Sequence, residues 1–106
     1  MKADDKLLSE VVQRILKVVR PERIILFGSG ADDTMTHDSD IDLLVIERGF
    51  RNEREEGIRL RSALTDLNLS VDIFAMAPER FEETKNVIGG LAYPANKYGK
   101  VIYEAA

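Results

Sequence analysis

Cysteine is absent from this sequence of 106 residues, and histidine occurs only once. Without cysteine the chain can form no disulfide and offers no thiolate ligand. A single histidine also argues against a zinc site built from imidazoles. Any bound metal must therefore be held by oxygen atoms.

A long hydrophobic run is missing too. No apolar stretch approaches the roughly 20 residues needed to span a bilayer. The first ten residues, MKADDKLLSE, lack the apolar block of a secretory signal. We therefore expect a soluble, cytoplasmic protein with no membrane contact. Its length suits one domain with one core, residues 1–106.

The sequence has no excess of basic residues. Fifteen Lys and Arg face nineteen Asp and Glu, which gives a formal net charge of -4. Proteins that bind nucleic acid usually present a basic face, so DNA and RNA are weak candidates for direct binding. Neither a Walker sequence nor a G-x-G-x-x-G motif is present.

Hydrophobic periodicity predicts a small mixed α/β domain. Apolar residues within 7–19 share one helical face, and Pro21 ends that helix. Short apolar runs predict strands at 23–27, 41–46, 70–76 and 101–103, and further helices begin near Glu53 and at Pro78. Residues 91–98 fit neither pattern clearly. This order predicts a sheet of three to four strands with helices mainly on one face.

Between Gly28 and Glu47 the chain carries six acidic residues and no Lys or Arg. Side chains alternate faces along a strand, so Asp38, Asp40 and Asp42 are expected on one side. Carboxylates this close repel each other unless one is protonated or a cation joins them. We therefore interpret the six-acid cluster as a metal site, and Mg²⁺ suits such an all-oxygen site. The acidic residues are Asp32, Asp33, Asp38, Asp40, Asp42 and Glu47.

Simpler explanations exist for part of this cluster. Asp38 and Ser39 are common turn residues, and Asp40 could be a local cap. Asp42 is harder to explain, because a carboxylate between Ile41 and Leu43 in so apolar a strand is costly without a partner. We therefore predict that Asp40 and Asp42 bind metal.

Asp72 is a second acidic residue inside an apolar strand, the predicted strand 70–76, where Val71 and Ile73 flank it. If its strand lies beside strand 41–46, Asp72 joins the same site. It could then complete the metal shell or accept a proton from an attacking hydroxyl. The alternative is a structural salt bridge to an arginine.

Gly28 and Ser29 follow directly after strand 23–27. Because Gly28 has no side chain, its backbone can approach phosphate oxygens closely, and the Ser29 hydroxyl can donate a hydrogen bond to them. A Gly-Ser pair after a strand is also compatible with an ordinary turn.

The combination of these features resembles the nucleotidyltransferase superfamily that includes DNA polymerase β. Gly28-Ser29, ten further residues, Asp40-Ile41-Asp42 and a later strand with Asp72 carry the resemblance. The length of the chain and its ending narrow it to the minimal nucleotidyltransferases, over nearly the whole sequence. The resemblance implies a polymerase β palm-like fold.

The resemblance also implies roles for individual residues. Asp40 and Asp42 would bind two divalent ions, and Asp72 would help activate the acceptor hydroxyl or contribute to the metal shell. Gly28 and Ser29 would hold the triphosphate of ATP. One departure stands out: the family usually has x-Ala-Arg-Gly after Gly-Ser, whereas residues 30–33 are Gly-Ala-Asp-Asp. An acid in place of the Arg is expected to weaken nucleotide binding.

We therefore expect a Mg²⁺-dependent protein adenylyltransferase that moves AMP from ATP to a hydroxyl. The resemblance implies that this is the antitoxin of a toxin-antitoxin pair, that its partner is a helical HEPN-type toxin, and that the acceptor is a tyrosine. Residues 53–67 or 93–98 could contact that partner. The alternative is a catalytically weak or inactive antitoxin that neutralises its partner by contact, which Asp32 and Asp33 favour. A transferase for small molecules such as aminoglycosides is a third possibility, which the lack of a second domain opposes.

Overall fold

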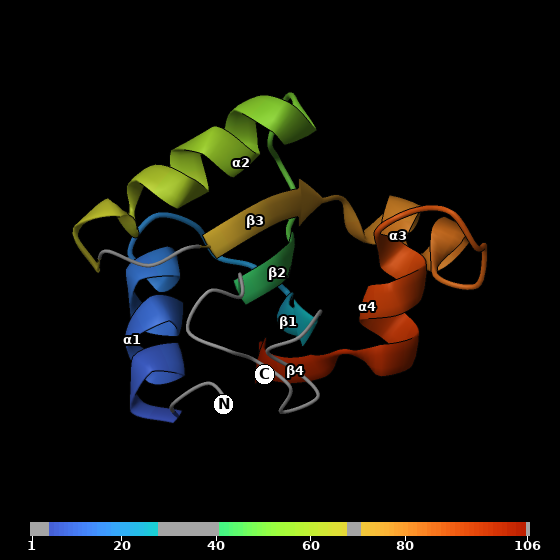
Figure 1. Ribbon diagram of the computed structural model, residues 1–106. Coiled ribbons are helices and arrows are strands. Elements are labelled where there is room, and N and C mark those ends of the chain that lie inside the picture. Colours follow the sequence, from blue (N-terminus) through green and yellow to red (C-terminus); the bar gives the residue numbers. More distant parts are fainter. Residues whose placement is uncertain (1–4, 28–40, 68–70, 106) are drawn as a thin grey trace.

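A computed structural model describes residues 5–27, 41–67 and 71–105 of the chain (Figure 1). All four predicted strands are present in this part, as are the three predicted helices. Residues 91–98, which fitted neither pattern, include a fourth helix. The elements in chain order are α1 (Asp5–Leu16), β1 (Arg23–Phe27), β2 (Ile41–Ile46), α2 (Glu53–Ser62), the 3₁₀ helix η2 (Thr65–Leu67), β3 (Val71–Met76), α3 (Pro78–Thr84), α4 (Ala92–Tyr98) and β4 (Lys100–Glu104).

The four strands form one mixed sheet in the order β3-β2-β1-β4. β1 runs antiparallel to both β2 and β4, whereas β2 and β3 are parallel. β2 therefore lies inside the sheet, as its nearly continuous apolar sequence predicts. β3 and β4 are the two edges. This four-stranded mixed sheet confirms the predicted α/β fold.

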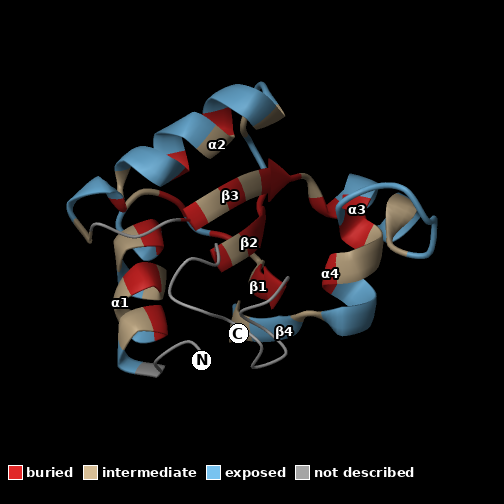
Figure 2. Ribbon diagram, in the orientation of Figure 1, coloured by how far each residue is buried: buried red, intermediate tan, exposed pale blue. Residues whose placement is uncertain are grey.

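Helices cover both faces of the sheet (Figure 2), although the sequence analysis placed them mainly on one. The two longer helices, α1 and α2, pack on one face through residues such as Val11, Ile15 and Leu60. The shorter α3 and α4 close the other face with Phe81, Ala92 and Ala95. The position of α3 and α4 on this second face is hard to predict from the sequence, because these helices pack on the sheet through only one large residue and two alanines. None of the described helices has the length and apolar composition of a membrane span.

Gly99, which joins α4 to β4, has no room for a side chain. A Cβ atom at this position would collide with the carbonyl oxygen of Ala95 and with the side chain of Ile25. We expect Gly99→Ala to lower the free energy of unfolding by about 1–3 kcal/mol, the usual range for overpacking. Urea unfolding followed by circular dichroism measures the change. Gly90→Ala is the matched control, because a Cβ there meets no atom within 4 Å, and an equal loss in both variants would contradict the expectation.

Candidate active site

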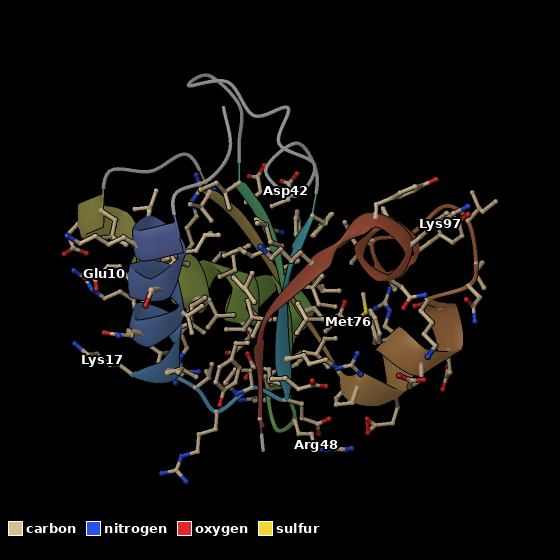
Figure 3. All side chains as sticks on the ribbon, turned by 90° about the horizontal axis from the view of Figure 1, so that it is seen from below. Glu10, Lys17, Asp42, Arg48, Met76 and Lys97 are labelled. Atoms are coloured by element: carbon tan, nitrogen blue, oxygen red, sulfur yellow. The ribbon has the colours of Figure 1, made fainter. Side chains whose placement is uncertain are left out.

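Asp42 and Asp72 lie side by side at the starts of β2 and β3. The two strands are parallel, and their register pairs Asp42 with Asp72 directly. Both residues are half-buried. Paired residues on neighbouring strands lie about 5 Å apart and share one face of the sheet. The expectation that strands 41–46 and 70–76 are neighbours is confirmed, and Figure 3 shows Asp42 at one end of the sheet.

Apolar residues surround this carboxylate pair on its own face. Leu44 and Ile46 follow Asp42 at alternate positions in β2 and are fully buried. Phe27, the last residue of β1, pairs with Asp42 across the sheet, and its ring lies 6.5 Å from that of Phe74. The strand ends therefore hold two carboxylates at the rim of a rigid apolar layer. Repulsion between two ionised groups at this spacing favours a bound cation or a shared proton.

The alternative explanation of Asp72, a salt bridge to an arginine, finds no support in the described part of the chain. No Arg or Lys of residues 5–27, 41–67 and 71–105 forms an ion pair with Asp72. Among the described residues, therefore, no cation competes for the Asp72 carboxylate.

The donor chemistry of this site fits a hard divalent cation such as Mg²⁺, because both described side chains present carboxylate oxygens. Two carboxylates are a partial ligand set, and the described residues contain no group of three or more metal-ligating side chains. Asp40 was predicted to supply the next carboxylate. It lies outside the described residues, as do Gly28, Ser29, Asp32, Asp33 and Asp38.

Glu47 does not belong to this site, although it was counted in the acidic cluster. It follows the last residue of β2, five positions beyond Asp42, which is about 16 Å along a strand at about 3.3 Å per residue. Figure 3 labels its neighbour Arg48 at the end of the molecule opposite to Asp42. The prediction that all six acids form one metal site is therefore wrong for Glu47, because the extended strand separates it from the others.

Glu47 instead forms a buried carboxyl pair with Glu56 of α2. Their exposed fractions are 4% and 7%. Burial, followed by the hydrogen bond and the negative charge of Glu56, raises the pKa of Glu47 to about 8, while Arg59 acts in the opposite direction. Arg59 Nη1 lies 3.1 Å from Glu56 Oε2, so Glu56 has a cationic partner. An ionised Glu47 would leave its Oε2 buried with no hydrogen-bond partner among the described residues.

A local signal in the sequence could have suggested the position of Glu47, namely an acid directly after the apolar run of residues 43–46. Its partner could not have been found in this way. Glu56 lies in a helix whose sequence, EREEGIRLRS, contains three glutamates. Only the packing of α2 on the sheet distinguishes the buried one from the others.

Sequence comparison identifies the class of protein. A family model described as "Nucleotidyltransferase domain" matches residues 5–93. This match spans most of the chain, including Asp42 and Asp72, so the chain belongs to the nucleotidyltransferase domain family. No curated protein sequence matches it significantly.

Two solved structures share the fold. One is described as a nucleotidyltransferase from Sulfolobus solfataricus, with a TM-score of 0.66, 18% identity, and coverage of 94% of this chain and 79% of the other. The second is a toxin-antitoxin structure with AMP-PNP, with a TM-score of 0.64, 20% identity, and coverage of 91% and 73%. At these identities the likeness establishes the nucleotidyltransferase fold.

Proposed function

We propose that this nucleotidyltransferase moves AMP from ATP, in the presence of Mg²⁺, to a tyrosine hydroxyl of a partner protein. The partner is the HEPN-type helical toxin of a toxin-antitoxin pair, and this chain is its cytoplasmic antitoxin. The direct pairing of Asp42 with Asp72 at one rim of the sheet carries the proposal. The family match supports the chemistry, and the likeness to a toxin-antitoxin structure with AMP-PNP supports the biological setting.

Each aspartate has a distinct role in this proposal. Asp40 and Asp42 would hold two Mg²⁺ ions, and Asp72 would contribute to the metal shell or accept the proton of the acceptor hydroxyl. When bound, the metal supplies positive charge that stabilises the negative charge of the transition state. Gly28 and Ser29 contact the triphosphate. The tyrosine oxygen forms a bond to the α-phosphorus as the bond to pyrophosphate breaks, and the hydroxyl proton passes to Asp72.

A second candidate function is neutralisation of the partner by contact alone. Its basis is the run Gly-Ala-Asp-Asp at residues 30–33, which puts acids where the family usually has an Arg. Two additional negative charges near a triphosphate would oppose its binding. The carboxylates at Asp42 and Asp72 oppose this second candidate, because binding by contact does not require them.

Transfer of label from ATP distinguishes the two functions. The purified chain is mixed with the protein encoded beside it, MgCl₂ and ATP labelled at the α-phosphate. We expect Mg²⁺-dependent label on a tyrosine of the partner. No label on the partner, or equal labelling by wild type and an Asp40→Asn/Asp42→Asn double variant, would rule out the transferase.

Neutralisation of toxin activity is measured in parallel with the same double variant. The transferase proposal predicts that the variant binds the partner but no longer neutralises it. Full neutralisation by the variant would select the contact-only antitoxin.

A further inference from the structure

A groove of about 350 Å³ lies beside β3, between α2 and the start of α4. Ile58 and Leu91, with exposed fractions of 59% and 36%, form its apolar sides. The half-buried Phe74 of β3 also lines it. The groove therefore presents apolar side chains from three separate elements on one accessible surface.

The backbone of β3 is closed to a partner at this side. β3 is an edge strand of the described sheet, but α2 packs against it. At Gly57 a Cβ atom would lie only 3.2 Å from the Ile73 carbonyl oxygen, so the helix backbone itself covers that carbonyl. Buried N–H and C=O groups without partners are costly. A segment that binds in the groove must therefore satisfy its own backbone hydrogen bonds.

Two arginines give the groove a positive charge. Arg54 and Arg61 of α2 line it and are exposed, and neither forms an ion pair with another residue that the structure describes. The carboxylate in the lining, Glu53, is already paired with Arg80 at 2.8 Å. The groove is thus locally cationic on a chain whose net charge is -4.

Arg54, Ile58 and Arg61 form one stripe along α2. They follow one another at intervals of four and three residues, the spacing at which side chains share one face of a helix. At about 1.5 Å per residue, the two arginines lie about 10.5 Å apart along the helix axis. Two acids seven residues apart on a neighbouring helix would have the same separation. Figure 2 shows α2 with a largely exposed outer surface beside β3.

These features define the occupant of the groove. A helix forms its backbone hydrogen bonds internally except at its ends, so it needs nothing from the covered edge of β3. Amphipathic helices bind apolar grooves through side chains three and four residues apart, and arginines select carboxylates. A second copy of the chain, packed α2 against α2, would bring Arg54 and Arg61 towards their own counterparts, and such like-charge contact is unfavourable.

We infer that the groove binds an amphipathic, acidic helix of a partner protein, which lies along α2. Apolar side chains from one face of that helix enter between Ile58 and Leu91. Two of its carboxylates, seven residues apart, pair with Arg54 and Arg61. This inference goes beyond the proposed transfer of AMP and does not depend on it.

Selection from a library of 18-residue peptides displayed on phage tests the inference with the full-length chain, without ATP or metal. This length exceeds the about 12–15 residues below which isolated helices are marginal. We expect enriched peptides to carry two acids seven residues apart, with apolar residues between them at helical spacing. Circular dichroism of synthetic copies should show that their helix content rises on binding.

Reversal of charge tests the role of the arginines. In the Arg54→Glu/Arg61→Glu variant the affinity for the selected peptides should fall at least about tenfold, which corresponds to about 1.4 kcal/mol. A peptide in which lysine replaces both acids should bind this variant at least about tenfold more tightly than it binds wild type. A merely structural effect of the double substitution would lower the affinity for both peptides.

The matched control is Arg20→Glu/Arg51→Glu, which changes net charge equally at two exposed arginines outside the groove. It should bind the selected peptides within about twofold of wild type, as should Asp42→Asn, which separates this test from that of AMP transfer. The inference is wrong if the selected peptides lack the paired acids or bind without gaining helix, or if both double variants lose affinity equally. It is also wrong if sedimentation shows a dimer that Ile58→Glu dissociates, since the occupant is then a second copy.

Discussion

Replacing Asp42 with Asn is expected to lower the rate of AMP transfer at least about a thousandfold. The substitution keeps the size of the side chain but removes the negative charge that we propose binds the metal. Metal ions contribute several kcal/mol to stabilising a charged transition state, and about 1.4 kcal/mol corresponds to a factor of ten. Asp42 is half-buried at the start of a strand within the sheet, and this position fixes where its carboxylate lies.

Single-turnover transfer at saturating ATP and increasing Mg²⁺ measures this effect. The Asp42→Asn variant should retain the circular dichroism spectrum of wild type. Asp66→Asn is the matched control, since Asp66 is exposed and pairs with Arg14 outside the site. It should transfer AMP within about twofold of wild type. Transfer by Asp42→Asn at more than a tenth of the wild-type rate would show that Asp42 is not a metal ligand in the reaction.

Glu47→Gln is expected to stabilise the protein at alkaline pH by about 3–4 kcal/mol. The pKa of Glu47 is raised from 4.5 to about 8 in the folded state, chiefly by burial and then by Glu56. The folded protein therefore holds this proton more tightly than the unfolded chain. The stabilisation that comes from this tighter proton binding is complete below pH 4.5 and is lost as the pH rises through 8. A shift of this size is on the order of 4–5 kcal/mol, at about 1.36 kcal/mol per pH unit.

Urea unfolding at pH 5 and at pH 9 measures the change. At pH 5 the variant should be within about 1 kcal/mol of wild type, because the amide of the introduced glutamine can donate to Glu56 as the protonated acid does. At pH 9 it should be clearly more stable. Glu55→Gln is the control, because Glu55 neighbours Glu56 in α2 but is exposed. An identical pH dependence in wild type and Glu47→Gln would show that Glu47 is not the titrating group.

The strands could be predicted from local sequence because their signals are local. β1 and β2 match their predicted bounds of 23–27 and 41–46. Both are short apolar runs in which nearly every residue is buried. α4 could not be predicted with the same clarity. It has only seven residues, includes Pro94, and buries only Ala92 and Ala95, so its helical conformation depends on packing against the sheet.

The candidate site, too, could be predicted only in part from the sequence. Asp42 and Asp72 could be singled out individually, because an acid in an apolar strand is costly wherever it lies. Their direct pairing could not be predicted, since it depends on β2 and β3 being parallel, adjacent and in a particular register. The Glu47–Glu56 pair was missed for a related reason, because an α-helix can turn any of several glutamates towards the sheet.

The sequence alone determined the family, the α/β class and the aspartates that stand out in its apolar strands. These follow from residue types, spacing and the cost of an acid in an apolar segment. The tertiary structure decided which acids act together. It paired Asp42 with Asp72 across two strands and moved Glu47 to the opposite end of β2, about 16 Å away at the rise of an extended strand. Distance along the chain does not set distance in space, and contacts between strands and helices form only when the sheet and its covering helices are assembled.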